Sequence, residues 1–129
     1  LLQWLFGPMQ EIRGVKSSLE DGTEWQYVLS GQMENGMLFS IKNSTRAILD
    51  NTARLYGSKG WGEIPEYWKA RKVIFSDGNT EEYPCDHELV YEVRHIAECF
   101  RKGLQESPVV TGRFSTRAIR TLETIKKNW

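Results

Sequence analysis

The pattern of apolar and polar positions divides the chain into a strand-rich part and a helix-rich part. Apolar residues occupy alternate positions at Trp25, Tyr27 and Leu29, which is the period of a β-strand. Asn35-Gly36 then separates two strand-like runs and predicts a tight hairpin. The same reading predicts strands at residues 10–19, 37–43, 48–56, 61–64, 72–75 and 81–83, with a second hairpin turn at residues 77–78.

Beyond residue 86 the apolar period changes to three and four, which predicts two helices. The first helix is expected to begin near Asp86. Its apolar stripe consists of Leu89, Val93, Ile96, Phe100 and Leu104. A second helix should follow Thr111-Gly112, with Ser115 as its N-cap. Its buried stripe is predicted to consist of Ala118, Leu122 and Ile125.

Strands that precede helices, rather than alternate with them, are typical of an α+β fold. We therefore expect an open, mostly antiparallel sheet with helices packed on one face. Several strands carry apolar residues on both faces, so either the sheet closes or the second face meets another subunit or domain. If the face stays open, Tyr27, Phe39 and Ile41 are the candidates for contacts in a homodimer.

Composition and charge limit the kinds of binding partner and the cellular compartment that we expect. The chain has 129 residues, which suits one domain, and its 17 Lys and Arg balance its 17 Asp and Glu. This balance gives no electrostatic reason to expect nucleic acid or an anionic membrane as a partner. No apolar run reaches the roughly 20 residues of a membrane helix. Two cysteines are too few for a disulfide scaffold, and they favour a cytoplasmic location.

A search for reaction chemistry identifies no catalytic, cofactor-binding or metal site. The glycines of residues 57–62 lack the spacing of a dinucleotide-binding loop, and the sequence after them is strand-like. His87 and His95 are eight residues apart, too far for one metal ion on one helix. Cys85 and Cys99 have no identifiable base beside them. The residues alone therefore favour a binding or assembly domain over a complete enzyme.

Tyr67-Trp68 is the most informative aromatic pair because it follows Pro65, in a predicted loop. The pair could cap the edge of the sheet, or it could line a pocket shared with another domain. The sequence pattern leaves both roles open.

Four segments together resemble the Gfo/Idh/MocA family of oxidoreductases, most closely its dimeric dihydrodiol dehydrogenase-like members. Residues 55–68 (LYGSKGWGEIPEYW) are similar to a family strand–turn–strand, and residues 91–108 (YEVRHIAECFRKGLQESP) to a family helix and the turn after it. Leu5-Phe6-Gly7-Pro8 resembles the end of the helix that enters the domain, and residues 115–126 resemble the last family helix. The similarity extends over nearly the whole chain.

The resemblance implies that residues 1–129 are the C-terminal substrate-binding and oligomerisation domain of an NAD(P)-dependent oxidoreductase. The parent would use NAD or NADP, and its dinucleotide-binding domain and catalytic lysine would precede this chain. Only Trp68 matches an aromatic that lines the family's substrate pocket, and the loop around Cys85–His87 is shorter than in the dihydrodiol-type members. The chain begins inside an apolar stretch, Leu1–Phe6, and stops at Trp129 after a basic helix end, so we expect a fragment of a longer protein. The alternative is a free-standing, non-catalytic α+β module for ligand binding or dimerisation.

Overall fold

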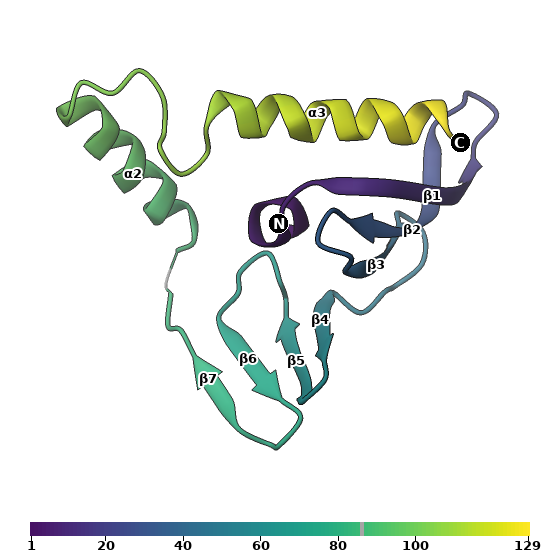
Figure 1. Cartoon of the computed structure of the whole chain (residues 1–129), viewed down its shortest axis with the longest axis horizontal. Helices are drawn as coiled ribbons and strands as arrows, with labels where there is room; N and C mark the ends of the chain where they lie inside the picture. Colours follow the sequence, from purple (N-terminus) through teal and green to yellow (C-terminus); the bar gives the residue numbers. More distant parts are fainter. Residues whose placement is uncertain (86) are drawn as a thin grey trace. The chain divides into compact units, whose positions relative to one another are not determined.

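A computed structural model describes residues 1–85 and 87–129 and shows an α+β fold (Figure 1). The expected beginning of a helix at Asp86 lies outside the described residues. In chain order the elements are α1 (Leu2–Phe6), β1 (Met9–Ser18), β2 (Glu24–Met33), β3 (Leu38–Ser44), β4 (Thr52–Gly57), β5 (Gly60–Pro65), β6 (Lys72–Phe75), β7 (Thr80–Glu82), α2 (Leu89–Arg101) and α3 (Gly112–Lys127).

The backbone divides into two compact units. The first unit contains residues 1–49 and 104–129, and the second contains residues 50–103. The first holds the antiparallel sheet β1-β2-β3, and the second holds the antiparallel sheet β4-β5-β6-β7. The predicted α+β class with open antiparallel pairing is confirmed. The strands form two separate sheets rather than one continuous sheet.

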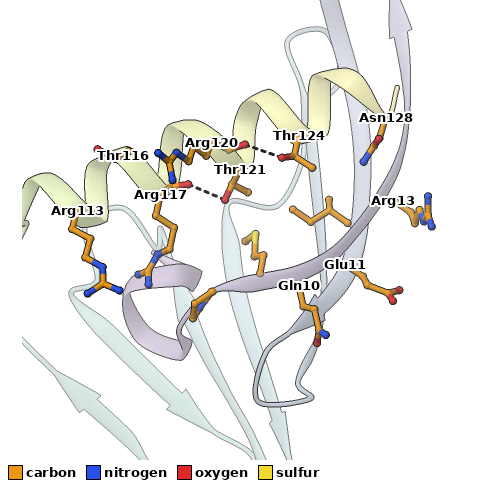
Figure 2. A pocket seen from close by; sticks show the side chains of 13 residues that line it. Gln10, Glu11, Arg13, Arg113, Thr116, Arg117, Arg120, Thr121, Thr124 and Asn128 are labelled. Carbon is orange, nitrogen blue, oxygen red and sulfur yellow. Dashed lines mark hydrogen bonds between the residues drawn. The ribbon is translucent and has the colours of Figure 1, made fainter.

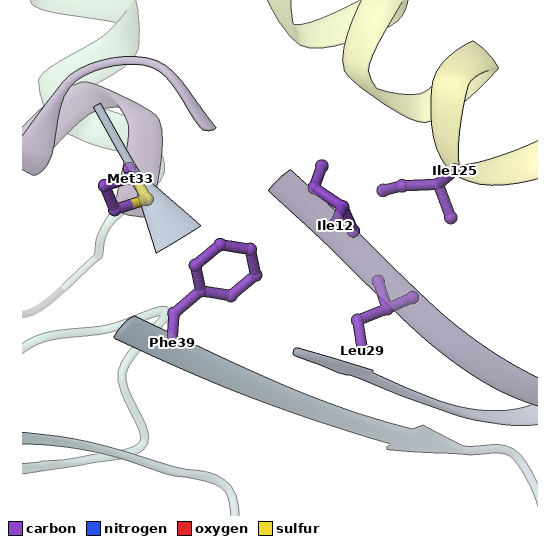
Figure 3. Packing of buried hydrophobic residues seen from close by; sticks show 5 residues of the cluster. All are labelled: Ile12, Leu29, Met33, Phe39 and Ile125. Atoms are coloured by element: carbon purple, nitrogen blue, oxygen red, sulfur yellow. The ribbon is translucent and has the colours of Figure 1, made fainter. Parts of the chain in front are cut away.

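The first unit has a small hydrophobic core between its sheet and α3. Five side chains are buried there, from three strands and the last turns of α3: Ile12, Leu29, Met33, Phe39 and Ile125 (Figure 3). The strand register places Ile12 opposite Gly31, and Gly31 opposite Phe39. A Cβ atom at Gly31 would lie 1.9 Å from the backbone oxygen of Glu11, so only glycine permits this strand separation.

The dimer-contact candidates lie on the covered face of this sheet, which corrects their assignment to an open face. Phe39 belongs to the buried core, and Tyr27 and Ile41 pack against that core. Alternation along a strand shows which residues share a face but not which face a helix covers, and α3 covers this one. Val15 and Val28 are paired across β1 and β2 on the opposite face, where Val15 is 71% exposed.

The second unit is organised by strand pairing and surface contacts. Its sheet places Ala53 opposite Ile64, and Arg54 opposite Glu63. The Arg54 Nε donates to Glu63 Oε2 at 2.8 Å, and the guanidinium lies 4.5 Å from the centroid of the Trp61 ring. No described side chain of residues 50–103 is buried.

Three helix predictions need correction. The N-cap of α3 is Thr111, whose hydroxyl accepts a hydrogen bond from the Phe114 amide at 3.2 Å, so the helix begins earlier than a Ser115 cap requires. On α3, Ile125 is buried but Leu122 is 56% exposed. The predicted stripe of α2 is exposed throughout, and Phe100 at its end is 79% exposed.

The fourth strand also begins later than predicted, at Thr52, because residues 48–51 have no strand partner there.

Candidate functional site

The loop between β5 and β6 carries Trp68, the substrate-contact candidate. The rings of Tyr67 and Trp68 meet edge to face, with 5.5 Å between their centroids. Both rings remain accessible, since Tyr67 is 43% exposed and Trp68 is 49% exposed. An exposed aromatic pair in this geometry offers a flat apolar surface that can stack against a ligand.

The backbone of this loop is held in an unusual conformation. Glu66 and Ala70 both have a φ of 46°, in the left-handed region that residues with a side chain rarely adopt. The Lys69 amide donates to the Glu66 oxygen at 2.7 Å, and the Tyr67 amide donates to the Asn51 oxygen at 3.4 Å. The turn therefore fixes the Tyr67-Trp68 pair at a local conformational cost, a feature that often marks binding sites.

Charged residues connect this loop to the segment that leads into α2. The Arg71 Nη2 lies 3.5 Å from Glu88 Oε2, and the Tyr83 amide donates to the Arg71 oxygen at 2.7 Å. The pKa of the Glu88 carboxyl is lowered, chiefly by a hydrogen bond from its own backbone amide. The positive charges of Arg71 and Lys69 lower the same pKa further. This carboxylate stays ionised at neutral pH and does not act there as a general acid.

Among the described residues, the cysteines and histidines do not assemble into a recognisable reaction centre. His95 Nε2 lies 3.6 Å from Cys99 Sγ, one turn apart on α2, and Cys85 is also a free thiol. Within residues 1–85 and 87–129, no group of three or more His, Cys, Asp or Glu side chains could hold a metal ion. The described part of the chain therefore places no metal ligand set near Trp68.

A groove in the first unit was not predicted from the sequence. It has a volume of about 740 Å3 and lies between the first residues of β1 and one side of α3 (Figure 2). Its α3 wall is polar and basic, and consists of Arg113, Thr116, Arg117, Arg120, Thr121, Thr124 and Asn128. The spacing of Arg113, Arg117 and Arg120 was visible in the sequence, because residues four and three apart share one side of a helix.

The chain is similar to known proteins in sequence and in fold. The chain is 31% identical to the trans-1,2-dihydrobenzene-1,2-diol dehydrogenase of Mus musculus over 98% of its own length, and 26% identical to the enzyme of the same name from Sus scrofa over 92%. The aldose-aldose oxidoreductase of Caulobacter crescentus, solved in complex with glycerol, superposes with a TM-score of 0.73 over 94% of the chain at 17% identity. That likeness shows a shared fold. No protein-family model matches the chain.

The chain spans only 41% of the mouse protein, 39% of the pig protein and 39% of the Caulobacter chain. It corresponds to the C-terminal domain of oxidoreductases of the Gfo/Idh/MocA type, which confirms the resemblance seen in the sequence. None of the described helices is long and apolar enough to cross a lipid bilayer.

Proposed function

We propose that residues 1–129 form the substrate-side domain of an NAD(P)-dependent oxidoreductase. The observation that carries this proposal is the similarity to trans-1,2-dihydrobenzene-1,2-diol dehydrogenases over nearly the whole chain. The parent reaction is hydride transfer between a nicotinamide and a hydroxyl-bearing carbon of a sugar, polyol or diol. The alcohol loses a hydride and a proton and becomes a carbonyl compound, while NAD(P)+ becomes NAD(P)H.

In this proposal the chain shapes the pocket and leaves the redox step to the rest of the parent. Trp68 packs its ring against the C–H face of the substrate, and Tyr67 holds that ring by edge-to-face contact. The left-handed residues on either side of the pair support this role, because they fix the loop before a ligand binds. The catalytic and cofactor-binding groups belong to polypeptide outside this chain.

We further propose that the parent is a homodimer that pairs through the open face of β1-β2-β3. This face presents Val15, Val28 and Leu38, and Leu38 is 76% exposed. Val15→Lys should weaken self-association in analytical ultracentrifugation, whereas Val109→Lys, at a half-exposed position between α2 and α3, should not. If the unsubstituted protein is monomeric at all concentrations, the proposed homodimer is contradicted.

A cytoplasmic location is part of the same proposal. Both cysteines that the structure describes are free, which suits a reducing compartment. Fractionation of the source cells with an antibody against the chain tests this location directly.

Nicotinamide binding separates this proposal from the free-standing module. The 129-residue chain should not change the fluorescence of NADH, and the gene upstream of Leu1 should encode a strand, a glycine-rich loop and a helix. Submicromolar binding of NADH by the chain alone would contradict the division of roles. A start codon directly before Leu1 would favour the non-catalytic module.

A further inference from the structure

We propose that the groove between β1 and α3 binds a small molecule with an anionic phosphate or carboxylate group at each end. This function goes beyond the proposed oxidoreductase role and does not depend on it. The groove lies wholly within the first unit, whereas Trp68 lies in the second.

Three arginines give the α3 wall of the groove its positive charge. Arg113, Arg117 and Arg120 follow one another at spacings of four and three, and the Arg113 and Arg117 side chains point away from the helix toward the α1–β1 stretch (Figure 2). None of the three forms an ion pair with any described carboxylate. Like charges at these spacings destabilise an isolated helix, so the arrangement calls for a compensating negative charge.

The position of the arginines on α3 increases this need. Arg113 lies in the first turn of the helix, which contains no acidic residue, and Arg117 lies in the next turn. The amide dipoles place positive potential at this end, where acidic side chains are normally preferred. Lys126 and Lys127 lie at the opposite end, where their charge is favourable. The Glu106 carboxylate also lies at this end and accepts from the Gly112 amide at 2.7 Å, but it forms no ion pair with the arginines that line the groove.

The hydrogen-bonding groups of the groove define the chemistry of the ligand. The hydroxyls of Thr116, Thr121 and Thr124 donate to helix carbonyls one turn earlier, at 2.9, 3.0 and 2.9 Å. Their protons are already used, so the remaining side-chain donors are the arginines and the amides of Gln10 and Asn128. The guanidinium groups can only donate, so a ligand that binds them offers acceptors, and their planar shape suits phosphate or carboxylate oxygens.

Contacts of Arg117 hold one guanidinium in place while leaving donor capacity. Its Nη2 donates to the Gln3 backbone oxygen at 3.3 Å, and its Nε is buried without a partner in the described residues. Its guanidinium also lies 5.3 Å from the centroid of the Phe114 ring. Arg117 is thus a fixed centre of charge, with the more exposed Arg113 and Arg120 on either side of it.

The β1 wall does not neutralise this charge. Glu11 is the one carboxylate that lines the groove, and its side chain extends away from α3, as does that of Arg13 (Figure 2). Ile12 between them belongs to the core beneath α3, so its neighbours on the strand face the other way. A ligand in the groove would therefore meet arginines on one side without a competing carboxylate.

Size and spacing favour a small molecule with separated charges. The volume of about 740 Å3 lies within the range of small-ligand pockets. Arg113 and Arg120 are seven residues apart, which is about 10 Å along the helix axis. A ligand that reaches both side chains therefore needs negative groups near its two ends.

The test measures binding to the 129-residue chain by calorimetry at constant ionic strength. The probes are fructose 1,6-bisphosphate for phosphate groups and suberate for carboxylate groups, with inorganic phosphate as the single-charge comparison. At least one of the two long probes should bind at least tenfold more tightly than inorganic phosphate. The stronger of the two identifies the anionic group.

Matched substitutions assign the binding to the groove. Arg113→Gln and Arg120→Gln should each weaken binding of the stronger probe about tenfold, since each removes one charge-assisted contact. Lys127→Gln removes the same charge from the same helix outside the groove and should change the affinity less than twofold. Circular dichroism of the three variants serves as the control that each of them is folded.

Three results would overturn the proposal. The first is no binding of either long probe, and the second is an equal effect of all three substitutions, which indicates unspecific attraction. The third is a poly-glutamate peptide that binds more tightly than both probes, which would assign the groove to an acidic protein segment. None of these results bears on NADH, so the oxidoreductase proposal is tested separately.

Discussion

The two compact units differ in how they are stabilised. The first unit buries five apolar side chains between three strands and α3. The second unit contains a sheet of four shorter strands and a helix of 13 residues, yet none of its described side chains is buried. It depends on backbone pairing, on the Arg54–Glu63 contact and on turns.

This difference indicates a division of roles within the chain. A buried core makes the first unit the more rigid scaffold, because close packing resists local opening. The second unit keeps Tyr67, Trp68 and the apolar stripe of α2 accessible. Accessible apolar surface of this kind is typical of regions that bind ligands or partners.

The largest contrast should come from one substitution made in each unit. Phe39→Ala removes a ring that is 9% exposed, and it should lower the free energy of unfolding by about 3–5 kcal/mol. Phe100→Ala removes a ring that is 79% exposed on α2, and it should cost less than about 1 kcal/mol. Urea denaturation followed by circular dichroism measures both values. Equal losses would contradict the division into a packed unit and an open one.

Two strand glycines should respond to alanine in opposite directions. Gly31→Ala places a Cβ 1.9 Å from the Glu11 oxygen and should destabilise the first sheet by more than about 2 kcal/mol. Gly62→Ala meets nothing closer than Phe75, at 3.8 Å, and should stabilise the second sheet by about 0.5–1 kcal/mol. Thermal denaturation of both variants gives the comparison. A stable Gly31→Ala variant would show that β1 and β2 pair differently.

The N-cap of α3 provides a smaller effect. Thr111→Ala removes the hydroxyl that accepts from the Phe114 amide and should cost about 1 kcal/mol. Ser115→Ala, at the position that the sequence predicted as the cap, should change stability by less than about 0.5 kcal/mol. In the second unit, the N-cap residue of α2, Glu88, forms no side-chain cap hydrogen bond, so no substitution there removes such a bond. If Ser115→Ala lost more stability than Thr111→Ala, the result would contradict Thr111 as the N-cap of α3.

The β5–β6 loop should give the smallest effect, and the effect should be stabilising. Ala70 has a φ of 46°, so Ala70→Gly relieves steric strain and should stabilise the chain by up to about 1 kcal/mol. Ala53→Gly, in strand β4 of the same unit, should instead destabilise it by about 0.5–1 kcal/mol. Differential scanning calorimetry resolves the two signs. Destabilisation by both substitutions would show that the loop conformation is unstrained.

Turn chemistry and strand alternation made much of the backbone predictable. Asn35-Gly36 and Asp77-Gly78 predicted hairpins, and both glycines have a positive φ, 86° and 88°. Periodicity also located both long helices. It could not show what covers an apolar stripe, and the stripe of α2 is exposed although the predicted fold packs the helices on a sheet. For the same reason Phe39 was assigned to the wrong face of its sheet.

The candidate sites were predictable only in part. Trp68 was identified through its place in a family motif, since its residue type and its position after Pro65 left two roles open. The left-handed conformation of Glu66 and Ala70 has no signal in residue type, because neither is glycine or asparagine. The arginines of α3 were visible, but their lack of acidic partners depends on residues distant in the sequence.

The proposed role of Trp68 can be measured by steady-state kinetics of the longer oxidoreductase to which we propose that this chain belongs. Trp68→Ala is compared with Trp4→Ala, a tryptophan of the first unit that is 53% exposed. We expect Trp68→Ala to raise KM for the alcohol substrate about tenfold, through loss of one stacking contact, and Trp4→Ala to leave KM unchanged. An unchanged KM for Trp68→Ala, or an equal rise for both variants, would contradict the assignment of the second unit to the substrate.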